Sequence, residues 1–380
     1  MTNEVKPASL PFYLRGAGFL LFLALLVALL YCGRPILVPV VTALLFAFLV
    51  MPIVRKLESW QLPAWLASLA GVLTVILCVI AMVLFFSWQF SHFLEDMPTM
   101  EQAMETKKKS IFRYIESHYD ISRREQAQWW DQKTTEMLNA GASGLMGFFT
   151  ATWALFATMV LIPIFMFFLL LYRQKFKRFI ELLNPDRSDE MLEIMRKISR
   201  VSQQYIRGMF IVIIILTVLN AIGFLLIGLK YAILLAFMAA LLNIIPYIGV
   251  LIGSLIPVAV ALVTKDSVIY AFAAFGICSF VQFLENNFIT PKIVGSSVNL
   301  NPLASILALL GGALLWGVPG MVLGIPLLGM FKVVCDHVAR LRPLGFVLGE
   351  ETEYKPFRFK RVRIPGLKKP ASTKKEPTGL

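Results

Sequence analysis

Four polar residues recur at helical spacing in an otherwise apolar part of the chain. Ser279, Gln282, Glu285 and Asn286 lie three and four positions apart, which places them on one face of a helix. A charged residue at the centre of a membrane helix costs about 2.5–3.5 kcal/mol on insertion scales, so it normally faces a cavity or a partner. We therefore predict that Glu285, Gln282 and Asn286 bind a substrate or an ion.

Glu285 has a second interpretation. Only 18 uncharged residues, 267–284, separate it from Asp266. A membrane helix needs about 20. In this interpretation Glu285 lies near the end of its helix, where it reaches interfacial water or pairs with Lys292.

Two apolar runs, 231–264 and 293–331, are interrupted by Pro and Gly. The interrupting residues are Pro246, Gly249 and Pro257 in the first run and Gly317, Pro319, Gly320 and Pro326 in the second. Proline has no N–H, so the carbonyls of Leu242, Gly253, Leu315 and Val322 lose their helical partners. At membrane depth, open backbone is buried in protein or lines a water-filled cavity. The runs therefore predict a transport site made of broken helices, with Asn243 and Tyr247 as further ligands.

The breaks leave the path of the chain open. Each run either crosses the membrane as one span with an ordinary proline kink, or enters and leaves on the same side as a helical hairpin. The two paths differ in the side of the membrane on which each places Lys265-Asp266 and 291–301. Charge counting does not distinguish them, because both return the C-terminal tail to the same side.

Composition assigns these elements to a membrane. The 380 residues are 58% hydrophobic and 16% charged, against about 45–50% and 25% in soluble domains. A soluble enzyme or nucleic-acid binder is thereby excluded as the first interpretation. The charge-free stretches are 16–33, 35–54, 59–94, 137–172, 208–229, 231–264, 267–284 and 293–331. They predict an all-α, polytopic membrane protein of about eight hydrophobic segments, two of them broken or re-entrant near Pro246 and Pro319.

Basic residues predict the orientation. Segment 173–207 has nine basic and five acidic residues and 339–380 has eleven and four, whereas 91–136 has seven and nine. Cytoplasmic loops carry the excess of Lys and Arg, so both termini are expected in the cytoplasm. The expected organisation is three membrane helices in 1–94, an extracytoplasmic helical excursion at 95–140, a fourth membrane helix in 141–172, a cytoplasmic amphipathic segment at 173–207, a membrane core with broken helices at 208–338 and a basic, disordered cytoplasmic tail at 339–380.

Motifs for other chemistries are missing from the sequence. It contains no phosphate-binding G-x-x-x-x-G-K-[ST], no H-E-x-x-H and no Cys/His cluster with metal spacing. We therefore expect no catalytic residue, no metal and no cofactor. An ATP-driven pump encoded in this chain is excluded, and the chain is predicted not to be an enzyme.

Several short motifs recur in order and carry a resemblance. They are Tyr205-Ile-Arg-Gly208, Asn243-x-x-Pro246-Tyr247-x-Gly249, Glu285-Asn286-x-x-x-x-Pro291-x-x-x-Gly295, Asn301-Pro302-Leu303, Gly311-Gly312, Gly317-x-x-Gly320 and Ile325-Pro326-Leu327. With this set the chain resembles the autoinducer-2 exporter (AI-2E, PerM-like) permease family over roughly 15–340. The resemblance implies a permease of the bacterial inner membrane, a homo-oligomer and the export of a small polar signal. Other members look like sodium- or lithium-for-proton antiporters; a His is more usual at Asn301, a departure that weakens antiport here.

Three functions follow. The leading hypothesis is a secondary or facilitative permease that exports a small polar solute such as an autoinducer-2-like signal. The second is a sodium(lithium)/proton antiporter in which Glu285 alternately holds a proton and a cation. The third is an envelope organiser that transports nothing and uses 95–140 as a contact arm. The expected partners are membrane lipid, a small polar solute or a cation, and further copies of the chain, but no nucleic acid.

Overall fold

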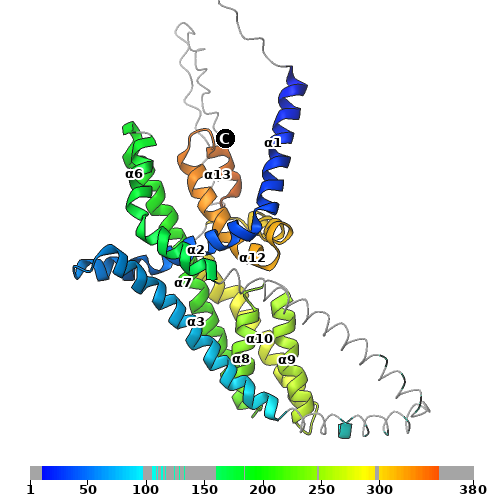
Figure 1. Ribbon diagram of the computed structural model, residues 1–380. Helices are drawn as coiled ribbons and strands as arrows, with labels where there is room; N and C mark the ends of the chain where they lie inside the picture. The colour runs from blue at the N-terminus through cyan, green and yellow to red at the C-terminus, as the bar shows by residue number, and fades with distance from the viewer. Residues whose placement is uncertain are drawn as a thin grey trace, which may run out of the picture.

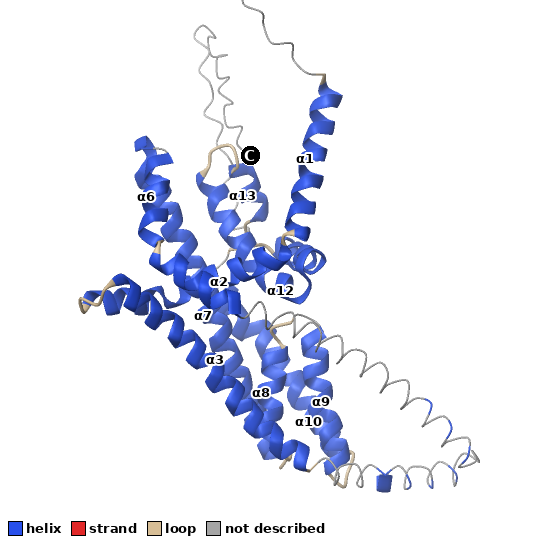
Figure 2. Ribbon diagram, in the orientation of Figure 1, coloured by secondary structure: helices blue, strands red, loops and turns tan. Residues whose placement is uncertain are grey.

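Helices make up nearly all of the chain that the structure describes (Figure 2). The computed structural model describes residues 11–96, 160–183, 185–245, 248–295 and 299–350, with scattered positions between 105 and 132. Pro246 and Tyr247, most of the predicted excursion 95–140, 141–159 and the tail beyond residue 350 lie outside these ranges. The predicted all-α class is confirmed.

The helices follow the apolar runs, because backbone N–H and C=O groups in lipid must be satisfied within the chain. In order they are α1 (Phe12–Cys32), α2 (Arg34–Ser59), α3 (Ala64–Glu95), an apolar helix at Val160–Leu171, α6 (Arg173–Leu183), α7 (Ser188–Leu226), α8 (Ala232–Leu242), α9 (Ile248–Thr264), α10 (Ile269–Leu284), the π-helical turns η2 (Glu285–Ile289) and η3 (Pro291–Gly295), α12 (Pro302–His337) and α13 (Arg342–Leu348).

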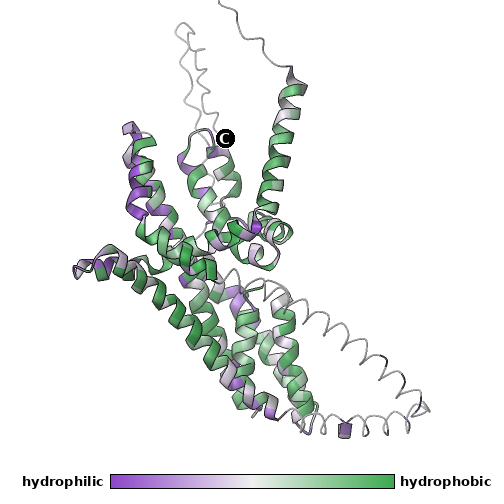
Figure 3. Ribbon diagram, in the orientation of Figure 1, coloured by the Kyte–Doolittle hydropathy of each residue, from purple (hydrophilic) through white to green (hydrophobic). Residues whose placement is uncertain are grey.

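Length and composition identify a polytopic membrane protein. Among the described residues, five helical stretches are long and apolar enough to cross a membrane, namely Arg34–Ser59, Ala64–Phe93, Pro185–Leu226, Ile269–Val294 and Pro302–His337. Four shorter apolar helices accompany them, Gly16–Cys32, Val160–Leu171, Ala232–Leu242 and Gly249–Thr264. Figure 3 shows apolar residues along most of α1 and α3, and many of their large side chains are exposed. Such surfaces suit lipid.

The first interrupted run is a helical hairpin of α8 and α9. A Cβ added to Gly249 would lie 1.7 Å from the carbonyl oxygen of Leu242, and one added to Gly253 would lie 3.1 Å from Ala239. These contacts pair the two helices in antiparallel order, side by side in Figure 1. The carbonyl of Leu242, predicted to be open, instead accepts from the N–H of Ile245 at 2.9 Å, because the reversal supplies a new donor. Pro257 does not end the helix, since α9 continues through it.

The second interrupted run is also a hairpin, within α12. Its chain reverses at Gly317, whose φ of 64° and ψ of −141° are non-helical and fall in a region that only glycine adopts at low cost. A Cβ on Gly312 would lie 2.1 Å from the carbonyl oxygen of Gly320, and one on Gly324 would lie 2.4 Å from that of Ala308. The arms therefore run antiparallel with backbones in close contact, and the second arm continues helically through Pro326.

The two hairpins start from opposite ends of α7. At one end, Lys230, just before α8, pairs with Asp96, just after α3. At the other, His337 at the end of α12 contacts Lys197 in the N-terminal part of α7, with Nε2 and Nζ 2.9 Å apart. Figure 1 agrees: α6, α13 and the beginning of α1 lie towards one end of the molecule, and the end of α3 lies at the other.

In two segments the local structure differs from the one that the sequence predicts. The amphipathic segment 173–207 is not separate from the membrane core, because α7 continues without a break through Arg207. The beginning of the basic tail is ordered as α13, which packs on α12. The amide of Asn301 helps to hold it there, donating to the carbonyls of Val347 at 2.6 Å and Gly349 at 3.2 Å.

Candidate functional site

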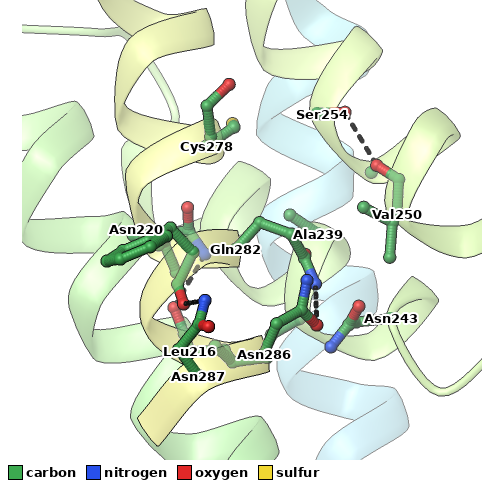
Figure 4. A pocket seen from close by; sticks show the side chains of 15 residues that line it. Leu216, Asn220, Ala239, Asn243, Val250, Ser254, Cys278, Gln282, Asn286 and Asn287 are labelled. Atoms are coloured by element: carbon green, nitrogen blue, oxygen red, sulfur yellow. Dashed lines mark hydrogen bonds between the residues drawn. The ribbon is translucent and has the colours of Figure 1, made fainter. Parts of the chain in front are cut away.

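A cavity lined by amides lies between α7, the α8–α9 hairpin and α10 (Figure 4). Its volume is about 390 Å³, within the range of small-molecule sites. Five amide and two hydroxyl side chains line it, from Asn220, Asn243, Ser254, Ser279, Gln282, Asn286 and Asn287. Apolar residues and the thiol of Cys278 complete the wall. We call it the amide cavity.

A second cavity of about 350 Å³ lies where both hairpins meet α7. Tyr205 comes from α7, Asn243 from the end of the α8–α9 hairpin, Glu285 from η2, and Ser305 and Ile325 from the two arms of α12. Most of the remaining lining is apolar, and Glu285 is the one charged side chain among the described lining residues. We call it the carboxylate cavity.

Glu285 is held by two donors. Its exposed fraction is 8%. One carboxylate oxygen accepts from the Thr290 hydroxyl at 2.6 Å, and the other accepts from the Gln282 side-chain amide. Among the described residues it has no ion pair, and Lys292 is exposed. In the described part of the chain Glu285 therefore does not pair with Lys292, but it does lie at the end of its helix, because α10 ends at Leu284. Its contact with interfacial water stays a prediction.

The π-helical turn η2 brings Thr290 to Glu285. The Thr290 N–H donates to the Glu285 carbonyl five residues back, whereas an α-helix pairs residues four apart. Pro291 follows directly; in an α-helix its ring would clash with the carbonyl of Asn287 and it has no N–H to offer. The wide turn removes this conflict, and isolated π-turns are frequent at functional sites.

The structure places four of the predicted ligands together. Gln282, Asn286 and Asn243 line the amide cavity, and Glu285 adjoins it in the carboxylate cavity. Pro246 and the fifth predicted ligand, Tyr247, are outside the described residues. The helix-breaking residues Pro257, Gly317, Pro319, Gly320 and Pro326 do not line either cavity, and neither do the carbonyl-bearing residues Leu315 and Val322. Their contribution is to shape the hairpins.

Sequence reasoning missed several contributors to the two cavities, and Asn220 and Thr290 are the most informative of them. Asn220 is buried on α7 and lines the amide cavity; its signal was available, because it is the one amide in the charge-free stretch 208–229. Thr290 was not chosen as a ligand, since an offset of five residues leaves the face that α-helical spacing defines. Helical periodicity alone contains no signal for it.

Gly208 of the Tyr205-x-x-Gly208 motif allows η3 to pack closely on α7. A Cβ on Gly208 would lie 3.1 Å from the carbonyl oxygen of Ile293, so glycine permits the close approach of η3 to α7. Tyr205 is buried and lines the carboxylate cavity. Within the described part of the chain, no three His, Cys, Asp or Glu side chains gather in a group that could hold a metal ion.

Comparison with known proteins identifies relatives along most of the chain. The sequence profile of the AI-2E family transporters matches residues 20–340. YueF of Bacillus subtilis is 26% identical over 80% of this chain and 84% of its own length. PerM of Escherichia coli is 28% identical over 79% and 86%. The AI-2 transport protein TqsA of Escherichia coli is 23% identical over 89% and 97%.

Proposed function

This chain belongs to the AI-2E family of transporters, and from that premise we propose that it exports a small polar solute by way of the amide cavity. It is a multi-pass membrane protein of a bacterial transporter family, not an enzyme. The proposal concerns the solute, the direction of transport and the residues that carry it.

The observation that carries the proposal is the composition of the amide cavity. Seven amide and hydroxyl side chains converge on a space of about 390 Å³ among helices that are otherwise apolar. Amides both donate and accept hydrogen bonds, so they suit a neutral solute that bears hydroxyl and carbonyl groups. The amide cavity adjoins a helical hairpin, and discontinuous helices often form transport sites.

The proposed solute is a polyhydroxylated molecule like autoinducer-2. The absence of charged side chains among the described residues of the amide cavity favours a neutral solute over an anion or a cation. The relative TqsA carries the name AI-2 transport protein. Both points support this class of solute for the chain.

Location and partners are part of the same proposal. We place the protein in the inner membrane with both termini in the cytoplasm, from the distribution of Lys and Arg. Its partners are membrane lipid, the solute and further copies of the chain. Native mass spectrometry of the detergent-solubilised protein gives the number of subunits.

Transport in proteoliposomes tests the proposed function. Purified protein should release preloaded autoinducer-2 from vesicles, and Asn243→Leu, which removes an amide common to both cavities, should slow the release. Ser59→Ala is the matched control, because Ser59 is exposed at the end of α2, away from both cavities. Release no faster than from protein-free vesicles contradicts the proposal.

One observation favours sodium(lithium)/proton antiport as a second candidate. Glu285 is buried, has no ion pair among the described residues and faces a cavity of its own. The same vesicles test it with imposed sodium and pH gradients and no organic solute. Movement of sodium against protons in wild type that is lost in Glu285→Gln supports antiport. The third hypothesis, an envelope organiser, depends on 95–140, most of which lies outside the described residues.

A further inference from the structure

We infer that Gln282 couples the two cavities, so that protonation of Glu285 changes the hydrogen-bonding groups that the amide cavity offers to its solute. Gln282 is thus a positioning residue for both sites. The inference rests on the proposed function, because it assigns to that function a proton as the second ligand.

The two cavities share part of their walls. Leu216, Ala240 and Asn243 line both. Gln282 lines the amide cavity, and its side chain reaches Glu285, which lines the carboxylate cavity. A change in hydrogen bonding on one side of this wall therefore acts directly on groups of the other side.

The amide nitrogen of Gln282 is shared between the cavities. Nε2 donates to Glu285 Oε2. It also donates to Asn286 Oδ1 at 3.2 Å, a bond drawn in Figure 4. An amide nitrogen has two hydrogens, and these bonds use both. The result is a continuous chain of hydrogen bonds, from Thr290 and Gln282 into Glu285 and from Gln282 onward to Asn286.

Protonation adds a hydrogen-bond donor to the side chain of Glu285. An ionised carboxylate only accepts hydrogen bonds, whereas a protonated carboxyl also donates one. With Glu285 protonated, Gln282 can turn its carbonyl oxygen towards the new donor, and Asn286 Oδ1 then loses its partner. Asn286 turns in response, which exchanges donors and acceptors on the wall that the solute contacts.

Among the described residues, the lining of the carboxylate cavity holds few ionisable groups besides Glu285. Among the described residues that line the carboxylate cavity, Tyr205 on α7 is the other titratable side chain. Neither the α8–α9 hairpin nor α12 contributes a charged residue to its lining. Arg207 on α7 and Lys292 on η3 are exposed and do not line it.

The coupling is reciprocal and measurable. If a proton on Glu285 changes the affinity for the solute by some factor, the solute changes the affinity of Glu285 for the proton by the same factor. Coupling between sites typically corresponds to about 5–150-fold. We therefore expect the dissociation constant of autoinducer-2 for the wild-type protein to change at least about fivefold between acidic and neutral pH.

Three variants, measured by calorimetric titration with autoinducer-2, test the inference. Gln282→Met keeps the length of the side chain but removes the amide, and it should bind more weakly with no dependence on pH. Glu285→Gln should also lose the pH dependence. The matched control Asn220→Leu removes an amide of the same cavity that bonds to the Leu216 carbonyl rather than to Glu285. It should bind more weakly and keep the wild-type change with pH.

The control separates coupling from a merely structural role. If Gln282 only shaped the cavity, Gln282→Met would lower affinity and keep the pH dependence, as Asn220→Leu does. That result overturns the inference, and so does a wild-type affinity that does not change with pH.

A solute-free measurement separates failure of this inference from failure of the proposed function. If wild-type protein does not bind autoinducer-2, the proposed solute is wrong, but the hydrogen bond still has a signature. The infrared carbonyl band of protonated Glu285, identified by its loss in Glu285→Gln, should shift in Gln282→Met and stay in place in Asn220→Leu. An unshifted band in Gln282→Met contradicts the inference.

Discussion

Hydrogen-bond donors around one carboxylate dominate the chemistry at the scale of single residues. Glu285 has a hydroxyl and an amide as partners, not a cation. A charge that is buried without an ion pair can change its protonation state at lower cost than one held in a salt bridge, because no opposite charge is left behind. This arrangement suits a group that binds and releases a proton or a cation during transport.

Glu285→Gln tests the need for that charge. Glutamine has nearly the same shape but cannot ionise. Its oxygen can still accept from Gln282, and its NH2 group can donate to the Thr290 hydroxyl. We expect transport in proteoliposomes to fall at least about tenfold, equivalent to about 1.4 kcal/mol. Membrane insertion and the thermal unfolding midpoint should stay close to wild type. Full transport activity would show that the charge is dispensable.

Thr290 tests the second donor. Thr290→Val removes the hydroxyl from a nearly isosteric side chain and leaves one carboxylate oxygen without its partner. An unsatisfied buried group costs about 1–3 kcal/mol, so the unfolding midpoint in detergent should fall and transport should slow. Thr290→Ser keeps the donor and should behave like wild type. Equal unfolding midpoints for the valine and serine variants would show that the Thr290 hydroxyl does not stabilise the site.

Spacing predicted the members of this site that α-helical geometry brings together. Gln282, Glu285 and Asn286 were identified from intervals of three and four residues. Thr290 was not, because the π-turn changes the period within the motif itself. Nor could spacing show that Gln282 and Glu285 face different cavities, since that depends on which helices pack on each side of α10.

At the scale of elements, the two hairpins depend on backbone contacts that side chains would prevent. The antiparallel arms of α12 approach at Gly312 and Gly320, and those of α8 and α9 at Gly249 and Leu242. The clusters of Pro and Gly predicted an interruption in each run, and in α12 the reversal itself lies at Gly317. They did not decide between a kinked span and a hairpin, because that choice depends on contacts between residues that are distant in sequence.

A pair of adjacent glycines gives a matched test of the α12 hairpin. In Gly312→Ala the new Cβ would lie 2.1 Å from the Gly320 carbonyl oxygen, whereas in Gly311→Ala it meets nothing within 4 Å. Overpacking costs typically about 1–3 kcal/mol, so Gly312→Ala should lower the unfolding midpoint and reduce transport. Gly311→Ala should be neutral or slightly stabilising, since alanine is the better helix former. Identical midpoints would contradict the close packing of the arms.

At the scale of the whole molecule, the hairpins determine at which end of the protein each connecting loop lies. Lys265 lies near Gly228, beside the Lys230–Asp96 pair. Asn301 contacts Val347 and Gly349, at the end that continues into the basic tail. The two loops whose sides the sequence left open are therefore at opposite ends. The distribution of charged residues alone predicts the side of the membrane for the ends of the simple spans. It does not assign a side to these two loops.

Cysteine labelling tests this arrangement. In a Cys32→Ser, Cys78→Ser background, Ser267→Cys should react with a membrane-impermeant maleimide added to intact cells, because it lies at the end that we assign to the outside. Arg340→Cys, exposed beside α13, should react only after permeabilisation. The reverse pattern would invert the proposed orientation. Labelling of both positions from one side would contradict the hairpins.

The position of Cys278 gives the protein a natural reporter of occupancy. Its thiol lines the amide cavity, while Cys335 is fully buried elsewhere and the other two cysteines are exposed on α1 and α3. With those two replaced by serine, a small thiol reagent modifies the chain mainly inside the compartment where the solute is proposed to reside. The rate of modification then measures how often that compartment is empty, at a cysteine that the native chain already carries.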